Sequence, residues 1–400
     1  MLLSKTMLER YTKVLFWGLK KARHTEFTRE DIILVRYDLP GRDLACETFK
    51  GILKQGMYPI QRITLAPSME YSFYLLGEED QLSFIPPGEK ELFKHLNGLI
   101  SILAPESLTH LRDVDPAKIG KSLLARKQLR DILDERENNG DFSWTLCLMP
   151  SEELAKNAGL SIGEYTKQII KACYLDHDDP EKKWEEIYLD AMEIKDFLNS
   201  LEIETLHLES SNCDLMVSPG PYRKWVGISG HNIPSFEIFT SPDWRHTQGI
   251  YYMDQPSFRS GNLVKGLRLK FEQGRVIEFS AEQGEEFVGK QIQVDENACK
   301  IGEFSLTDKR FSRIDRFMAH TLYDENFGGE NGNSHIALGA SYSETYVQGG
   351  DKLTKQLKED LGFNDSALHW DLVNTEPKRV TAILKGGKKR TIYEDGMFKL

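Results

Sequence analysis

Hydrophobic positions in the first 150 residues alternate between a helical and a strand-like pattern. Leu8–Lys21 has apolar residues at the spacing of an amphipathic helix, whereas Ile32–Tyr37 is a short apolar run typical of a buried strand. Further helical and strand-like segments follow in turn: Arg42–Gln55, Ile60–Leu65, Glu89–Leu96, Gly98–Ala104, Ala117–Glu137 and Ser143–Met149. Because strands separated by helices favour parallel pairing, this order predicts an α/β N-terminal domain with a parallel sheet covered by helices.

The pattern changes in the second half of the chain. Ser151–Leu201 has helical spacing with a break at Asp178–Pro180, and short strand-like runs separated by Gly and Pro turns follow it. These runs are Leu206–Leu208, Leu215–Val217, Gly249–Met253, Leu267–Phe271, Arg275–Phe279, Val380–Leu384 and Arg390–Tyr393. Leu267–Phe271 and Arg275–Phe279 read as hairpin partners, and Val380–Leu384 and Arg390–Tyr393 as a second hairpin. We therefore expect an N-terminal α/β domain over residues 1–213 and an α+β domain over residues 214–400.

Composition narrows the class of protein. Of the 400 residues 40% are hydrophobic and 28% charged, which is typical of a globular chain long enough for two domains. The apolar runs are too short to span a membrane, and the N-terminus has the pattern of an amphipathic helix rather than of a signal peptide. The net charge of −11 disfavours nucleic acid and anionic membranes as partners.

Cysteine usage points to a reducing compartment. The five cysteines are odd in number and scattered, without a Cys-x-x-Cys pair: Cys46, Cys147, Cys173, Cys213 and Cys299. This arrangement argues against a disulfide framework and against a thiolate zinc site. We therefore expect a cytoplasmic protein.

Several catalytic and nucleotide-binding motifs can be excluded. Residues 159–163 match the Gly-x-Ser-x-Gly pattern of a hydrolase, but no strand leads into them. Ser161 and Glu164 instead have the spacing of a capping box at the start of a helix. The sequence contains no His-Glu-x-x-His, no Walker A sequence and no Gly-x-Gly-x-x-Gly. It therefore lacks the signatures of a serine hydrolase, a zincin and a dinucleotide-binding protein.

Acids and histidines in the C-terminal half occur in segments that are otherwise apolar or rich in Gly and Pro. These segments are Asn232–Pro242, Ile301–Glu303, Tyr323–Asn326, Ser334–Tyr342 and Leu368–Val373. An ionised carboxylate in such surroundings is costly to desolvate unless a counter-charge meets it, and a metal ion is the strongest counter-charge available. Because the donors are oxygen and nitrogen, zinc, cobalt or manganese would suit them.

The spacing of these residues suggests how they converge. His369 and Asp371 would lie on one face of a strand, since side chains alternate with period two. His335 and Tyr342 are seven residues apart, about two helical turns, so that one helix would direct both toward one point.

The five segments closely resemble the thermophilic-type metalloaminopeptidase family (the aminopeptidase T, aminopeptidase S and PepS type). The shared order is Asn-x-Pro-x-x-Glu-x-Phe-Thr-x-Pro, then Gly-Glu, Asp-Glu-Asn, His-Ile-Ala-Leu-Gly and His-x-Asp. The resemblance extends upstream through Pro150–Tyr165 and is weaker before residue 110. It implies a dinuclear exopeptidase that removes N-terminal residues from short peptides, and a homodimer that encloses the active sites.

The resemblance also assigns roles to residues. Two divalent ions would be held by Glu237, Glu303, Glu325, His335, His369 and Asp371. Tyr342 would be the catalytic tyrosine, and Glu237 is expected to be catalytic as well, although which carboxylate is the general base stays open. Two ions of this kind polarise the scissile carbonyl and activate water, and a phenol can stabilise the resulting oxyanion.

Some alternatives remain open at this point. Glu330 lies five residues before His335, the spacing expected of Glu325, because six extra residues lengthen the intervening segment. A dinuclear amidohydrolase acting on a non-peptide amide, and a catalytically silent metal-stabilised binding protein, are alternative functions. The sequence does not specify the physiological metal, the preferred N-terminal residue or the biological peptide pool.

Overall fold

The computed structural model describes residues 2–23 and 25–400, which form two compact units. The first unit comprises the residues up to Trp184 together with Ser229–Ile233, and the second comprises Glu185–Ile228 and Pro234–Leu400. This division differs from the expected one at residue 214, because β5 (Ile203–Ser210) already pairs with β17 (Lys378–Leu384) in a sheet of the second unit.

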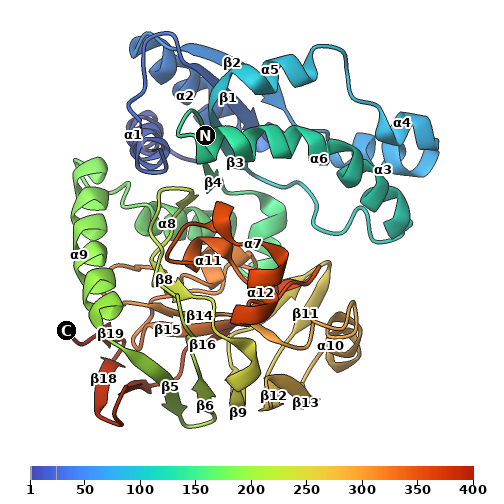
Figure 1. Ribbon diagram of the computed structural model, residues 1–400. Helices are drawn as coiled ribbons and strands as arrows, with labels where there is room; N and C mark the ends of the chain where they lie inside the picture. Colours follow the sequence, from blue (N-terminus) through green and yellow to red (C-terminus); the bar gives the residue numbers. More distant parts are fainter. Residues whose placement is uncertain (1, 24) are drawn as a thin grey trace. The chain divides into compact units, whose positions relative to one another are not determined.

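The first unit is built on a five-stranded parallel sheet with the order β2-β1-β3-β4-β7 (Figure 1). Its strands are β1 (Ile32–Tyr37), β2 (Tyr58–Ile63), β3 (Leu96–Leu103), β4 (Ser143–Leu148) and β7 (Asn232–Ile233). The predicted parallel sheet is thereby confirmed. The last strand is contributed by a short segment that returns to this sheet late in the sequence.

Helices cover both faces of this sheet. The helices of the first unit are α1 (Lys5–Lys21), η1 (Leu39–Gly41), α2 (Arg42–Lys54), α3 (Pro67–Leu76), α4 (Glu79–Ser83), α5 (Glu89–His95), α6 (Pro116–Asn138), α7 (Glu152–Ala158) and α8 (Ile162–Ala172). In β1, Leu34 belongs to an apolar cluster against which Phe93 of α5 and Leu133 of α6 pack. Its neighbour Ile33 faces the other side, close to Leu19 of α1. Alternate residues of one strand thus supply two apolar layers, as a buried parallel strand requires.

The segment with the Gly-x-Ser-x-Gly pattern is a helix junction. Gly159 ends α7 in the left-handed conformation (φ 70°), and Ser161 begins α8. The Ser161 hydroxyl accepts a hydrogen bond from the Glu164 N–H, while the Glu164 carboxylate accepts one from the Ser161 N–H. The predicted capping box is confirmed, and Ser161 is not a catalytic serine.

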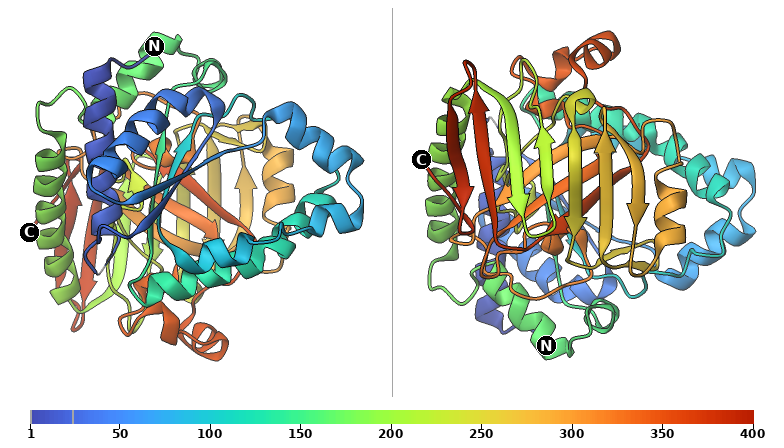
Figure 2. Two further views of the ribbon diagram at one scale, coloured as in Figure 1. Left: turned by 90° about the horizontal axis from the view of Figure 1, so that it is seen from above. Right: turned by 90° about the horizontal axis from the view of Figure 1, so that it is seen from below.

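The second unit begins within α9 (Pro180–Ser200) and contains an eight-stranded antiparallel sheet, seen face-on in Figure 2. The sheet order is β13-β12-β9-β6-β5-β17-β18-β19. Its remaining strands are β6 (Asp214–Val217), β9 (Gln248–Met253), β12 (Leu267–Glu272), β13 (Arg275–Ser280), β18 (Lys389–Glu394) and β19 (Met397–Phe398). Both predicted hairpins, β12–β13 and β17–β18, are confirmed.

A four-stranded antiparallel sheet with the order β16-β15-β14-β8 packs on the larger one. Its strands are β8 (Glu237–Thr240), β14 (Ile301–Thr307), β15 (Asn333–Gly339) and β16 (His369–Asn374). The Tyr251 hydroxyl of β9 lies 2.7 Å from the Leu372 oxygen, and that of Tyr393 in β18 lies 2.7 Å from the Thr307 oxygen. These hydrogen bonds fix one sheet on the other.

Short elements connect the two sheets. They are η2 (Trp244–His246), β10 (Ser257–Arg259), β11 (Asn262–Val264), α10 (Glu285–Gln291), α11 (Thr321–Asp324), η3 (Ser343–Thr345), η4 (Gly350–Lys352) and α12 (Lys355–Leu361). Every residue of β14 and β15 is buried, so the charged side chains that these strands carry must be compensated locally. Across residues 2–23 and 25–400, no helix has the length and apolar character needed to cross a membrane.

Candidate metal centre

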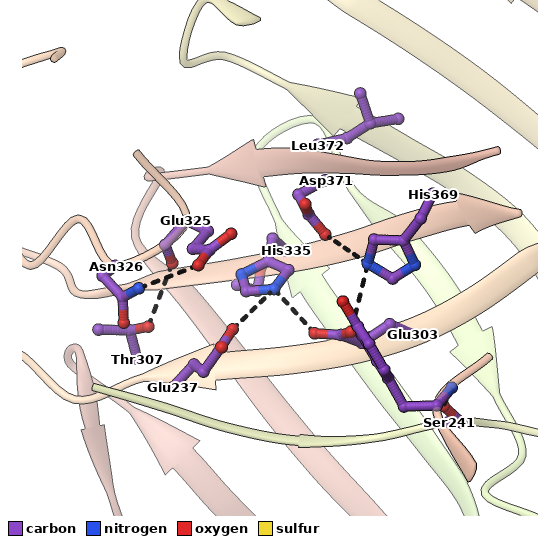
Figure 3. A network of polar contacts seen from close by, with 12 residues as sticks. Glu237, Ser241, Glu303, Thr307, Glu325, Asn326, His335, His369, Asp371 and Leu372 are labelled. Carbon is purple, nitrogen blue, oxygen red and sulfur yellow. Dashed lines mark hydrogen bonds and ion pairs between the residues drawn. The ribbon is translucent and has the colours of Figure 1, made fainter. Parts of the chain in front are cut away.

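The four-stranded sheet brings the predicted acids and imidazoles together on one face (Figure 3). The side chains come from all four strands: Glu237 of β8, Glu303 of β14, His335 of β15, and His369 and Asp371 of β16. In the strand register, Ala337 lies between Glu303 on one side and Asp371 on the other. Its small side chain leaves space above the sheet for the two carboxylates to approach the imidazoles.

Distances within this cluster give Glu303 a central position. The Nε2 atom of His335 lies 3.0 Å from Glu303 Oε1 and 3.3 Å from Glu237 Oε2. The Nε2 atom of His369 lies 3.7 Å from Glu303 Oε2 and 3.2 Å from Asp371 Oδ1. Each oxygen of Glu303 therefore faces a different histidine.

The side chains form two groups, each with its ligand atoms within 4.8 Å of one another. One group is Glu237, Glu303 and His335, and the other is Glu303, His369 and Asp371. The shared carboxylate is the arrangement expected where one acid bridges two cations. The donors are oxygen and nitrogen atoms without a thiolate, which suits zinc, cobalt or manganese.

The orientation of His369 also fits a metal ligand. Its Nδ1 atom lies 2.9 Å from the Ala340 carbonyl oxygen, which can only accept a hydrogen bond. When the ring is neutral, as a metal ligand must be, its proton lies on Nδ1 and the lone pair of Nε2 faces Glu303 and Asp371. His369 and Asp371 lie on one face of strand β16, as predicted. Trp370 between them is turned to the other face, where its indole N–H donates a hydrogen bond to the Ser257 hydroxyl.

Burial sets the acids of the cluster apart from ordinary carboxylates. Burial raises the pKa of Glu303 to about 7, although its hydrogen bond with His335 acts in the opposite direction. Burial alone would raise the pKa of Asp371 too, but the charge of His369 and its hydrogen bond outweigh burial and lower that pKa to about 2. Adjacent carboxyls with opposed pKa shifts are characteristic of functional sites.

The same acids shift the pKa values of the two imidazoles. Burial alone would lower the pKa of His369, but the charge of Asp371 and its hydrogen bond outweigh burial and raise that pKa to about 9. For His335, the hydrogen bonds with Glu237 and Glu303 likewise outweigh burial, so its pKa lies well above the ordinary value. The acids of the cluster thus favour positive charge on both imidazoles.

The structure distinguishes between Glu325 and Glu330. Glu325 follows α11 and is buried, and burial together with the charges of Glu237 and Asp371 raises its pKa well above the usual value. Glu330 is exposed on the surface. The geometry therefore brings Glu325 and not Glu330 to the cluster, although Glu325 lies outside the two close groups of ligand atoms.

Tyr342 reaches the cluster differently from what its spacing suggested. The predicted helix joining His335 and Tyr342 is wrong: His335 is in β15, which ends at Gly339, and Tyr342 precedes η3. Gly339 has a φ of 98° and lies against the Leu368 backbone, where a side chain would collide. The strand therefore turns there, and its continuation carries Tyr342 over the sheet.

The Tyr342 ring packs against the ring of His369, with centroids 4.7 Å apart, and against Phe239 at 5.5 Å. The residue is 43% exposed, and no hydrogen bond joins its hydroxyl to another of the described residues. Partial burial and the charge of Glu303 raise the Tyr342 pKa above its ordinary value. The phenol therefore keeps its proton and is available as a donor.

Sequence reasoning gave no role to Asn326, which is buried beside Glu325. Its amide nitrogen lies 3.3 Å from Glu325 Oε1 (Figure 3). The same nitrogen lies 3.0 Å from the Leu322 oxygen, and the amide oxygen accepts a hydrogen bond from the Phe236 N–H. Asn326 thus joins the segment of Glu325 to the residue before Glu237. The only signal in the sequence was its position next to an acid in Asp-Glu-Asn.

A testable consequence concerns Asp324, the last residue of α11. Its buried carboxylate accepts hydrogen bonds from the Met318 N–H (2.7 Å) and the His320 N–H (2.9 Å), yet burial raises its pKa to about 8. Because the folded protein then holds a proton that the unfolded chain releases above pH 4, Asp324 makes stability fall as pH rises toward 8. Asp324→Asn removes this titration.

The free energy of unfolding of Asp324→Asn is therefore expected to fall less steeply between pH 5 and pH 8, by on the order of a few kcal/mol over the window. Urea unfolding of both proteins in excess chelator at several pH values measures this difference. Glu303 contributes in the same direction in both proteins, so it does not affect the comparison. Parallel pH profiles for the two proteins would contradict the assignment.

Comparisons with known proteins give a family and a fold. The family described as thermophilic metalloprotease (M29) matches residues 4–398. Aminopeptidase AmpS of Bacillus subtilis (strain 168) is 25% identical over 327 residues, which cover 77% of this chain and 78% of the relative. Aminopeptidase 2 of Geobacillus stearothermophilus is 27% identical over 337 residues, covering 77% of each chain. The structure of wild-type AmpT from Thermus thermophilus has the same fold, with a TM-score of 0.78, 22% identity, and coverage of 99% of this chain and 100% of the other.

Proposed function

The chain belongs to the thermophilic metalloprotease family M29, an enzyme family that hydrolyses peptide bonds with the help of metal, and we propose that it is an aminopeptidase with a dinuclear site. Family membership confirms the resemblance noted in the sequence. The observation that supports two ions is the shared carboxylate: Glu303 presents one oxygen to His335 at 3.0 Å and the other to His369 at 3.7 Å.

The ligands divide between the two positions. One ion would be held by Glu237, Glu303 and His335, and the other by Glu303, His369 and Asp371. Glu325 would complete the first position, because its carboxyl is buried near Glu237. When bound, divalent ions of this kind polarise the scissile carbonyl and lower the pKa of water.

The protein's own residues supply the remaining chemistry. Tyr342 donates its hydroxyl proton in a hydrogen bond to the oxyanion that develops at the scissile carbonyl, since this phenol is protonated and packs against His369. The additional catalytic role of Glu237 stays a prediction, because its carboxylate is also placed to hold an ion.

Removal of metal tests this function. Dialysis against a chelator is expected to abolish hydrolysis of aminoacyl-amides, and zinc, cobalt or manganese should restore it, because no thiolate or nucleophile in the cluster replaces the ions. Substrates with a blocked N-terminus serve as the control and should not be cleaved. Full activity without metal would contradict the metal site, and equal cleavage of blocked substrates would favour an amidohydrolase.

The proposal also includes the size of the substrate, the oligomeric state of the enzyme and its location in the cell. The enzyme acts on short peptides, and two copies form a homodimer that encloses the active sites, as the resemblance implies. We place it in the cytoplasm, in agreement with five cysteines that are free of disulfides. Light scattering at several concentrations tests the dimer, and cleavage of a peptide-length series tests the size limit.

A further inference from the structure

Strand β8, which carries Glu237, and the residue that follows it both contact Tyr342. Glu237, Phe239 and Ser241 are separated by two residues each, so they face the same side of an extended chain. Phe239 packs against the Tyr342 ring at 5.5 Å, and the Ser241 hydroxyl oxygen accepts a hydrogen bond from the Tyr342 N–H at 2.8 Å. Figure 3 shows Ser241 beside the cluster.

Tyr342 is held by contacts of its ring and its backbone, and not by its hydroxyl. It lies in a connection after β15, it is 43% exposed, and its hydroxyl makes no hydrogen bond with another of the described residues. Its ring packs against Phe239 and His369, and its backbone N–H donates to Ser241. Its carbonyl oxygen accepts a hydrogen bond from the Thr345 hydroxyl at 2.7 Å, so Ser241 is the side chain that fixes the N–H side of this residue. Displacement of a donor by about 1 Å can cost two orders of magnitude in rate.

Ser241 is a rigid anchor for this N–H. The residue is wholly buried, and its carbonyl oxygen accepts a hydrogen bond from Arg223 Nε at 2.7 Å. The same guanidinium donates to the Leu361 oxygen at 2.8 Å and lies over the Phe363 ring at 3.3 Å. Arg223 therefore fixes the backbone of Ser241, and the Ser241 hydroxyl fixes the backbone N–H of Tyr342.

We propose that Ser241 is a positioning residue that fixes the Tyr342 hydroxyl over the metal centre, with Phe239 as the surface on which the ring rests. The proposal rests on the proposed function, in which Tyr342 stabilises the oxyanion. Ser241 acts only through Tyr342, so its effect on the rate must disappear when the Tyr342 hydroxyl is absent.

A double-mutant cycle with metal-loaded protein tests this dependence. Ser241→Ala is expected to lower kcat about tenfold and to leave KM within about twofold, because a misplaced donor weakens the transition state more than bound substrate. In the Tyr342→Phe background the same change should alter kcat less than about twofold. Metal content, measured first, should be equal in all four proteins.

Hydrogen exchange provides a readout independent of activity. Loss of the Ser241 hydroxyl should increase deuterium uptake by peptides that contain the Tyr342 amide, because this N–H loses its acceptor. Thr240→Val is the matched control: Thr240 is equally buried, and within the described part of the chain its hydroxyl has no hydrogen-bond partner. This variant should retain wild-type kinetics and exchange.

Two results would overturn the proposal: an equal loss of kcat from Ser241→Ala in both backgrounds, or unchanged kcat and exchange. Near wild-type kcat in Tyr342→Phe alone would instead refute the role of Tyr342 in the proposed function. The exchange experiment separates the two failures, since it reports whether Ser241 holds the loop regardless of catalysis.

Discussion

Glu303→Gln is expected to release both metal ions and to lower kcat about 10³-fold or more. Glu303 is the residue common to the two ligand groups, so its loss weakens both positions at once. Loss of the two ions would remove the several kcal/mol by which they stabilise the transition state. Each 1.36 kcal/mol corresponds to a factor of ten in rate. Elemental analysis after equilibration with zinc, followed by steady-state kinetics, measures both effects.

His369→Ala and Asp371→Ala are the matched controls for a bridging role. Each belongs to one group only, so each should lower the metal content from two ions per chain toward one. The fold should survive in Glu303→Gln, because a neutral amide removes a buried carboxyl whose pKa burial raises to about 7. Two ions retained by Glu303→Gln, or a single ion lost by all three variants alike, would refute the shared carboxylate.

The first unit was predictable because its strands are local apolar runs. Ile32–Tyr37 and Ser143–Leu148 are buried on both faces, and each is followed by a segment of helical spacing. Such a pattern specifies parallel pairing without reference to distant residues. The division of the chain was harder to predict, because β5 precedes residue 214 but finds its partner β17 near the C-terminus.

The strands of the metal centre could not be recognised in the same way. Ile301–Thr307 and Asn333–Gly339 are buried at every position, yet they contain Glu, His, Ser and Asn, which removes both the apolar run and the alternation. The seven-residue interval from His335 to Tyr342 matched a helical period by chance. Only the turn at Gly339 explains how that interval brings both side chains together.

The resemblance indicated which acids and imidazoles lie together in the cluster, whereas it gave no sign of the residues that support them. Ser241 and Asn326 are common neutral residues, and they act through a backbone N–H and a neighbouring carboxylate that no spacing reveals. The choice of Glu325 over Glu330 likewise depended on which side chain is buried. The sequence could not show this, because the segment between the two acids is lengthened.

Tyr342→Phe is expected to lower kcat by roughly 10²–10³ while KM stays within about threefold, by analogy with other oxyanion donors. The variant keeps the ring that packs between Phe239 and His369 and removes a single donor. A hydroxyl that contacts only the oxyanion stabilises the transition state more than bound substrate, so kcat must change more than KM. Steady-state kinetics with several aminoacyl-amides, after metal content has been checked, measures this split.

The competing explanation makes Tyr342 a structural residue whose hydroxyl satisfies a nearby carbonyl. The structure gives it little support, because the residue is 43% exposed and its hydroxyl has no hydrogen-bond partner among residues 2–23 and 25–400. Removal of a structural hydroxyl would lower the stability of the protein and leave kcat unchanged. Removal of an oxyanion donor would lower kcat and leave the stability unchanged. Thermal unfolding and steady-state kinetics of Tyr342→Phe therefore separate the two roles. A wild-type kcat at full metal occupancy would show that Tyr342 only contributes to packing.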